Sequence, residues 1–201
     1  MKESETILNK SSFIKELNAT LENGGVIAFV TDTVWGLGCL PDNEKGVDKI
    51  YEIKGRDRSK PLILMSDDFE KLKPYVKEIP QTAQNLIDKY FPGALTVILK
   101  KSEKTPDYVT SNMNTVGIRL PDNQFFKDLC KCIKGGVLAT TSANLSSHPS
   151  SKTYEEAKNS IGDLVDYVFQ DYGYSCKGKE STVVLAVDDN IKVLRQGSVC
   201  L

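Results

Sequence analysis

The chain has 201 residues, of which 40% are hydrophobic and 26% are charged, and its formal net charge at pH 7 is −1. This composition is typical of a globular protein with an ordinary core and excludes a disordered chain. The absence of a basic surplus argues against a dedicated nucleic-acid-binding protein.

Helical and strand patterns alternate along the chain. Apolar residues at helical spacing predict helices over residues 12–23, 45–53, 67–77, 82–90 and 123–133, and a further helix from Thr153, which has capping-box spacing to Glu156. Short apolar runs predict strands over residues 26–30, 62–65, 95–99, 116–120, 137–140, 165–169, 182–187 and 191–195. Because the two types interleave without a repeat or long linker, we expect one α/β domain over residues 1–201 with a largely buried central sheet.

Neither a membrane segment nor a metal-binding framework is predicted. The longest apolar runs, residues 26–30 and 183–187, are far shorter than the roughly 20 residues of a membrane span. The polar N-terminus lacks the apolar centre of a signal peptide, so we expect a cytoplasmic location. The five cysteines are scattered and odd in number, and the chain has a single histidine, so free thiols are expected and a zinc site is not.

Familiar nucleotide and hydrolase motifs fail on inspection. A dinucleotide-binding turn starting at Gly36 would need a third glycine where Pro41 stands. Residues 173–179 match the start of a phosphate-binding loop, but Glu180 replaces the required Ser or Thr and a strand follows instead of a helix. A Ser-His-Asp hydrolase would have to use His148, which lies in a Ser/Pro-rich loop without a supporting motif.

Polar side chains gather where predicted strands begin or end, which is where open α/β sheets bind their ligands. The clusters are residues 31–38, residues 54–61, Arg119, residues 140–144, and residues 180–182 with 195–197. Ordinary structural explanations stay open for them, namely a tight turn, a solvated loop and a helix cap. An arginine in a buried strand, however, is costly unless it is paired or bound to an anion.

The second cluster contains four alternating cations. If residues 54–60 are extended, Lys54, Arg56, Arg58 and Lys60 project to the same side. Glycines at positions 36 and 38 would let the backbone of the first cluster approach a ligand closely. Such an arrangement would suit the binding of phosphate or carboxylate groups.

In this order and spacing, the clusters resemble the YrdC-type threonylcarbamoyl-AMP synthase family over residues 25–197. The matching segments are residues 31–38, 54–56, 60–62, 91–96, 116–119, 142–144, 180–182 and 194–197. The resemblance implies a single twisted mixed β-sheet flanked by helices, with a positively charged concave face. The chain departs from the family pattern at Val30, Trp35 and Met65, and it resembles the short, single-domain form.

The resemblance also implies roles for individual residues. The catalytic set is expected to be Lys54, Arg56, Ser142 and Asn144. Threonine is expected to contact Thr33, Arg119 and Ser181. The nucleotide is expected to contact Lys54, Arg56, Thr140, Ser142, Asn144 and Arg195.

The implied reaction joins L-threonine, bicarbonate and ATP into threonylcarbamoyl-AMP, for threonylcarbamoyladenosine modification of tRNA. Mg²⁺ is expected to arrive with ATP, because no carboxylate cage is visible in the sequence. A tRNA-threonylcarbamoyl transferase machinery would use the product, and tRNA binding by this chain should be weak at most. The alternatives are an RNA-binding paralogue with weak or no synthase activity and an enzyme that transfers carbamoyl groups from carbamoyl phosphate.

Overall fold

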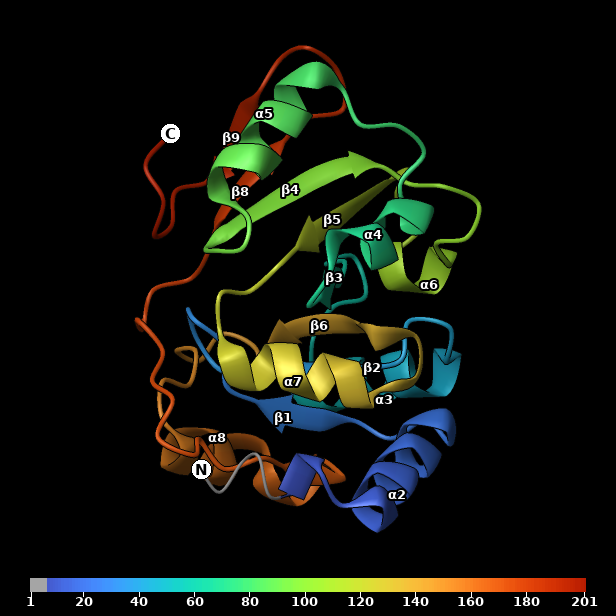
Figure 1. Cartoon of the computed structure of the whole chain (residues 1–201), viewed down its shortest axis with the longest axis vertical. Helices are drawn as coiled ribbons and strands as arrows, with labels where there is room; N and C mark the ends of the chain where they lie inside the picture. Colours follow the sequence, from blue (N-terminus) through green and yellow to red (C-terminus); the bar gives the residue numbers. More distant parts are fainter. Residues whose placement is uncertain (1–6) are drawn as a thin grey trace.

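The computed structural model describes residues 7–201. Within this part of the chain the strands form one nine-stranded sheet in the order β7-β1-β2-β6-β3-β5-β4-β8-β9. The strands are β1 Ile27–Phe29, β2 Gly36–Cys39, β3 Ile63–Ser66, β4 Leu95–Lys100, β5 Thr115–Arg119, β6 Val137–Ser142, β7 Tyr167–Val168, β8 Thr182–Leu185 and β9 Lys192–Arg195. Figure 1 shows them stacked from β1 near the bottom of the molecule to β9 at the top.

The sheet is mixed. The neighbours β1 and β7, β3 and β5, and β4 and β8 run parallel, whereas the other pairs are antiparallel. The predicted α/β class with a single mixed sheet flanked by helices is therefore confirmed.

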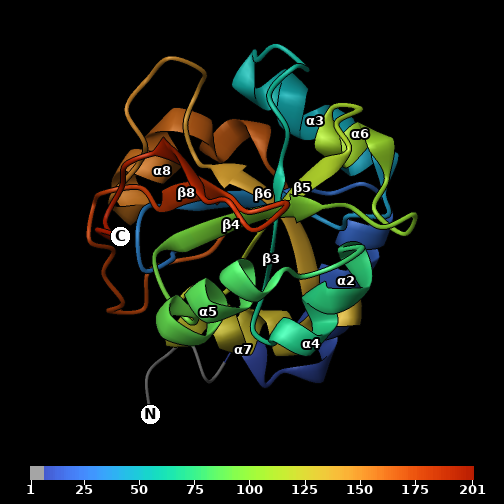
Figure 2. The ribbon, with the colours of Figure 1, turned by 90° about the horizontal axis from the view of Figure 1, so that it is seen from above.

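Helices cover both faces of this sheet. They are α2 Ser11–Glu22, α3 Glu44–Lys54, α4 Phe69–Leu72, α5 Gln81–Tyr90, α6 Asp107–Thr110, α7 Gln124–Cys132 and α8 Tyr154–Ile161. Figure 2 shows α3, α6 and α8 on one side of the sheet and α2, α4, α5 and α7 on the other. In residues 7–201 no helix is long and apolar enough to cross a membrane.

Helix α4 and strand β2 differ from the sequence-based prediction, and the single turn α6 was not predicted. The predicted helix over residues 67–77 is only the single turn α4, which a 3₁₀ turn at Lys73–Tyr75 follows because Pro74 lacks the N–H that a continuing α-helix needs. Strand β2 was not predicted, and two of its four residues are glycines, which are uncommon in strands.

The glycines of β2 serve the packing of the core. A Cβ atom added at Gly36 would lie 2.6 Å from Cε2 of Phe29, and one at Gly38 would lie 3.1 Å from Cε1 of the same ring. These glycines thus make room for the Phe29 side chain on the neighbouring strand. That they also let the backbone approach a ligand closely stays a prediction.

Candidate functional site

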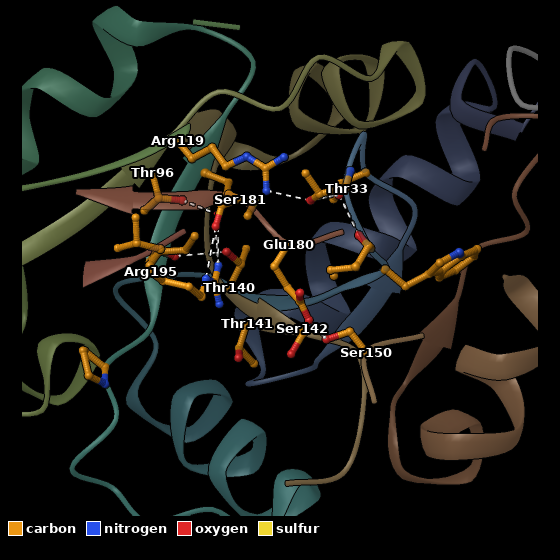
Figure 3. Close-up of a pocket in the computed structure, with 18 of the residues that line it drawn as sticks. Thr33, Thr96, Arg119, Thr140, Thr141, Ser142, Ser150, Glu180, Ser181 and Arg195 are labelled. Atoms are coloured by element: carbon orange, nitrogen blue, oxygen red, sulfur yellow. Dashed lines mark hydrogen bonds between the residues drawn. The ribbon is translucent and has the colours of Figure 1, made fainter. Parts of the chain in front are cut away.

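A pocket of about 260 Å³ is lined by residues that include Arg56, which follows α3, and Ser150, which precedes α8. Residues from all five polar clusters of the sequence line it (Figure 3). Seven of the nine predicted site residues are among them, namely Thr33, Arg56, Arg119, Thr140, Ser142, Ser181 and Arg195. The other two, Lys54 and Asn144, lie behind the wall of the pocket and do not line it.

Arg119 forms one end of the pocket, and each of its three side-chain nitrogen atoms has a protein partner. Its Nε donates to the carbonyl oxygen of Gly93 over 3.0 Å, its Nη1 donates to Thr33 Oγ1 over 2.9 Å, and its Nη2 pairs with the Asp32 carboxylate. Arg119 is only 2% exposed. Burial lowers the pKa of Arg119, and the Asp32 carboxylate opposes this effect. The counter-charge that a buried arginine requires is thus supplied by the protein.

The loop before β2 presents Thr33 to Arg119. The hydroxyl of Thr31 donates to the carbonyl oxygen of Val34 over 2.6 Å and accepts from the backbone N–H of Thr33 over 3.2 Å. This turn orients the Thr33 hydroxyl toward the guanidinium in Figure 3.

Ser181 and Arg195 form a second group, at the start of β8 and the end of β9. Arg195 donates to the carbonyl oxygen of Ser181 from Nε over 3.1 Å and from Nη2 over 2.9 Å. The Ser181 hydroxyl lies 2.8 Å from Thr96 Oγ1 and accepts from Arg195 Nη2 over 3.2 Å. Thr96, which was not among the predicted site residues, therefore helps to orient the Ser181 hydroxyl.

Arg56 follows α3 and reaches the pocket from a third direction. Its Nη1 donates to Thr141 Oγ1 over 2.9 Å, and its Nη2 donates to the carbonyl oxygens of Lys60 and Pro61 over 2.6 and 3.0 Å. Burial lowers the pKa of Arg56. Its Nε is buried without a hydrogen-bond partner in the described part of the chain.

The predicted one-sided row of cations in residues 54–60 does not exist. Helix α3 continues to Lys54 and ends at Gly55, whose left-handed φ of 55° turns the chain sharply. As a result, Arg58 points away and pairs with Asp48 over 2.6 Å. The assumption of an extended segment was wrong, because a helix and its C-terminal turn rotate successive side chains apart.

Lys54 is a buried residue, 4% exposed, and it belongs to α3, although the sequence analysis placed it beyond the end of that helix. Burial, with a smaller contribution from Arg56, lowers its pKa to about 7. Helical spacing from Val47, Ile50 and Tyr51 could have predicted this position on the buried face of α3.

Besides Thr31 and Thr96, three polar residues that line the pocket were not among the predicted site residues, namely Thr141, Ser150 and Glu180. The Thr141 hydroxyl accepts a hydrogen bond from Arg56, and the Ser150 hydroxyl donates to Glu180 Oε1 over 2.9 Å. Backbone and Ser150 hydrogen bonds lower the pKa of Glu180, so it is a carboxylate at neutral pH. Thr141 and Glu180 belong to clusters that the sequence revealed, whereas Ser150 has no such signal.

The structure also disfavours the phosphate-binding loop and the His148 hydrolase motif, which the sequence analysis rejected. The segment before Thr182 leads into β8, without the helix that a phosphate-binding loop requires. His148 is exposed, and its Nδ1 lies 3.1 Å from the carbonyl oxygen of Ser146.

The pocket combines three guanidinium groups, several hydroxyl groups and one carboxylate. This set is suited to a ligand that carries several negative charges. Among residues 7–201, no cluster of three or more His, Cys, Asp or Glu side chains could hold a metal ion. Hard oxygen donors that Mg²⁺ accepts are nevertheless present in the Ser142 hydroxyl and the Glu180 carboxylate.

Comparison with known proteins gives consistent matches. A family model described as telomere recombination, that of the Sua5, YciO and YrdC proteins, matches residues 19–197. A putative threonylcarbamoyl-AMP synthase of Methanocaldococcus jannaschii is 35% identical over 94% of this chain and 88% of its own.

Two solved structures are also similar to this chain. Pyrococcus abyssi Sua5 complexed with L-threonine has 32% identity and a TM-score of 0.85, covering 94% of this chain and 55% of its own. The YciO protein of Escherichia coli has 26% identity and a TM-score of 0.81, covering 94% of this chain and 90% of its own. The chain thus spans about half the length of P. abyssi Sua5 and most of the length of the other two proteins.

Proposed function

The chain belongs to the Sua5/YciO/YrdC family, and we propose on this basis that it is an L-threonylcarbamoyladenylate synthase. The enzyme condenses L-threonine, bicarbonate and ATP to threonylcarbamoyl-AMP and releases pyrophosphate. Relatives named threonylcarbamoyl-AMP synthase support this function. Residues 1–201 would act as one domain, and the predicted cytoplasmic location agrees with a reaction that consumes ATP.

The observation that carries the proposal is the convergence of three arginines from distant segments on one pocket, Arg56, Arg119 and Arg195. All three substrates contain anionic groups. Guanidinium groups bind carboxylate and phosphate oxygens in a two-pronged manner, and their charge is independent of pH in the physiological range.

We assign threonine to the end of the pocket that contains Thr33, Arg119 and Ser181. The solved P. abyssi complex shows that a relative binds L-threonine. Trp35 and Met65 also line the pocket and would supply apolar contacts for the threonine methyl group. We assign ATP to the part that contains Arg56, Thr140, Ser142 and Arg195.

The chemistry needs no nucleophilic side chain. The threonine amine condenses with bicarbonate, with loss of one water molecule, to give an N-carboxylate, whose oxygen attacks the α-phosphate of ATP and displaces pyrophosphate. Because both reactants are anions, the protein contributes by holding them together and by neutralising the charge that develops in the transition state. Arg56 is the arginine that we place next to the triphosphate.

Mg²⁺ is proposed to enter with ATP, and it would supply further neutralisation of the triphosphate charge. Ser142 and Glu180 are the residues that would face the ion. We also expect the reaction to depend on Lys54 and Asn144. The product would pass to a tRNA-threonylcarbamoyl transferase, with tRNA bound weakly at most by this chain.

Mass spectrometry can test the function directly. The purified protein is incubated with ATP, Mg²⁺, bicarbonate and L-threonine, and the product is compared with that of reactions lacking one component. Threonylcarbamoyl-AMP should form only in the complete mixture. ATP hydrolysis that is equal with and without threonine would contradict the proposal.

A further inference from the structure

Lys54 and Asn144 lie directly behind the pocket wall and are almost completely buried, with 4% and 7% exposure. Neither lines the pocket, although Arg56 and Ser142, two residues away in each case, do. Their side-chain contacts show what they do instead.

The ammonium group of Lys54 is fully engaged with one short segment of chain. It donates to the carbonyl oxygens of Ser142 and Asn144, both over 2.7 Å, and to Asn144 Oδ1 over 3.1 Å. A lysine ammonium has three N–H donors, so none remains for a substrate. The carbonyl oxygen of Lys54 accepts from the backbone N–H of Ser146 over 2.8 Å, which ties the same segment to the end of α3 a fourth time.

The Asn144 side chain is engaged in the same way. Its Nδ2 donates to the carbonyl oxygens of Leu145 and His148 over 3.1 and 2.6 Å. Its Oδ1 accepts from Lys54 Nζ and from Ser142 Oγ, the latter over 2.6 Å. Both amide donors and the amide oxygen therefore have protein partners.

This network fixes the direction of the Ser142 hydroxyl. The ammonium of Lys54 can only donate, and backbone carbonyl oxygens can only accept, so the amide of Asn144 can be oriented in one way. Its Oδ1 consequently faces Ser142, whose hydroxyl must donate its proton to it. Because its proton is used in this bond, Ser142 Oγ can offer only its lone pairs to a ligand in the pocket.

We propose that Lys54 and Asn144 are positioning residues, which brace residues 142–148 and make the Ser142 hydroxyl a hydrogen-bond acceptor toward the pocket, without touching the substrates. The inference rests on the proposed function, since it assigns how these two residues serve the synthase reaction. An acceptor at Ser142 suits a cation or an N–H or O–H donor of the nucleotide complex, whereas an unprotonated phosphate oxygen would be repelled. The role differs from direct contact with the nucleotide, which the family resemblance implied for both residues.

The matched variants for a test lie on one helix. Lys54→Met removes the brace while keeping a long side chain, and Lys45→Met changes an exposed lysine of α3 that has no ion pair in the described structure. Hydrogen exchange is followed at two amides of the braced segment, that of Ser146, which donates to the carbonyl oxygen of Lys54, and that of His148, which donates to the carbonyl oxygen of Leu145. In Lys54→Met the exchange of these amides should accelerate at least about tenfold, and in Lys45→Met it should not change.

A kinetic cycle with Ser142→Ala separates positioning from catalysis. If Lys54 acts through Ser142, the loss of kcat/KM caused by Ser142→Ala in the native background should nearly vanish in the Lys54→Met background. The inference would be overturned if amide hydrogen exchange in residues 142–148 were unchanged in Lys54→Met and if the losses of kcat/KM of the two single variants multiplied in the double variant. Lys54 would then be an independent catalytic charge.

Asn144→Asp provides a second variant in case Lys54→Met does not fold. It keeps the size of the side chain and an acceptor for Lys54, but it removes the donor to Leu145 and His148. Faster exchange at His148 is expected, and exchange at the native rate would contradict the brace. A native protein that makes no threonylcarbamoyl-AMP would refute the proposed function alone, because the exchange measurements need no activity.

Discussion

Arg119 on β5 donates a hydrogen bond from Nη1 to Thr33 Oγ1 over 2.9 Å, which joins residues 86 positions apart in the sequence. The same guanidinium pairs with the Asp32 carboxylate, and the whole group is buried. The loop after β1 and the end of β5 are thereby fixed relative to each other at the threonine end of the pocket.

Asp32→Asn should strongly destabilise the fold, because it leaves the buried Arg119 charge without its counter-charge. Breaking a buried ion pair by removing one partner typically costs about 3–5 kcal/mol. Urea denaturation of the native protein and the variant measures this difference. Asp48→Asn is the control, because it breaks the exposed pair with Arg58 and should cost less than about 1 kcal/mol. Equal effects of the two variants would show that Asp32 is not needed for Arg119.

Thr141→Val should impair the enzyme through Arg56, whose Nη1 donates to the Thr141 hydroxyl. A hydrogen bond to a charged group contributes about 1.5–3 kcal/mol, so a loss of roughly ten- to hundredfold in kcat/KM is expected. Thr141→Ser keeps the hydroxyl and should retain most of the activity. If valine and serine variants are equally active, the contact does not position Arg56.

Lys54 should make the stability of the protein depend on pH. Its pKa is about 7 in the folded protein and 10.5 in the reference state. Between these values the unfolded chain binds a proton that the folded protein has released, so the free energy of unfolding rises with pH. The stability that the neutral Lys54 contributes at high pH is therefore lost as the pH falls through about 7. The neutral amine still donates two hydrogen bonds to the braced segment.

Denaturation of the native protein and Lys54→Met at several pH values measures this contribution. Relative to the variant, the native protein should gain up to about 1.4 kcal/mol per pH unit between about pH 7.5 and 9. Parallel curves for the two proteins would indicate that the pKa of Lys54 is not lowered.

Serine should be a poorer substrate than threonine but should still react. Trp35 and Met65 line the pocket, and we expect them to contact the threonine methyl group. One missing methyl group in such a site changes specificity by about 1–3 kcal/mol, roughly 10- to 200-fold. Competition between the two amino acids gives the ratio of their kcat/KM values. A ratio near one would show that Trp35 and Met65 make no favourable contact with the threonine methyl group.

The sequence predicts the fold best where apolar spacing alone decides it. Helix α3 was predicted over residues 45–53 and spans Glu44–Lys54, because its buried face is apolar and a glycine ends it. Strand β2 could not be predicted in this way. It is stabilised by pairing with β1 and with β6, the latter about 100 residues later, and local propensity carries no information about such partners.

The candidate site was predictable as a set of clusters but not as a set of contacts. Thr33 and Arg119 could be singled out from the ends of their strands, yet their hydrogen bond depends on how the sheet brings β5 next to the loop after β1. The side chains of Lys54 and Arg58 do not project to the same side as predicted, because the chain turns at Gly55 and is not extended there.

Arg56→Ala, compared with Arg58→Ala, tests most directly that this pocket makes threonylcarbamoyl-AMP. The measurement is the incorporation of isotopically labelled bicarbonate into the adenylate, with melting curves of all three proteins alongside. The loss of a preorganised charge-stabilising group costs about 2.7–4 kcal/mol in the transition state, so Arg56→Ala should reduce synthesis roughly a hundred- to thousandfold, well beyond any change in stability. Arg58→Ala should remain close to the native rate, because Arg58 points away from the pocket. Near-native synthesis by Arg56→Ala would contradict the assignment of the reaction to this pocket.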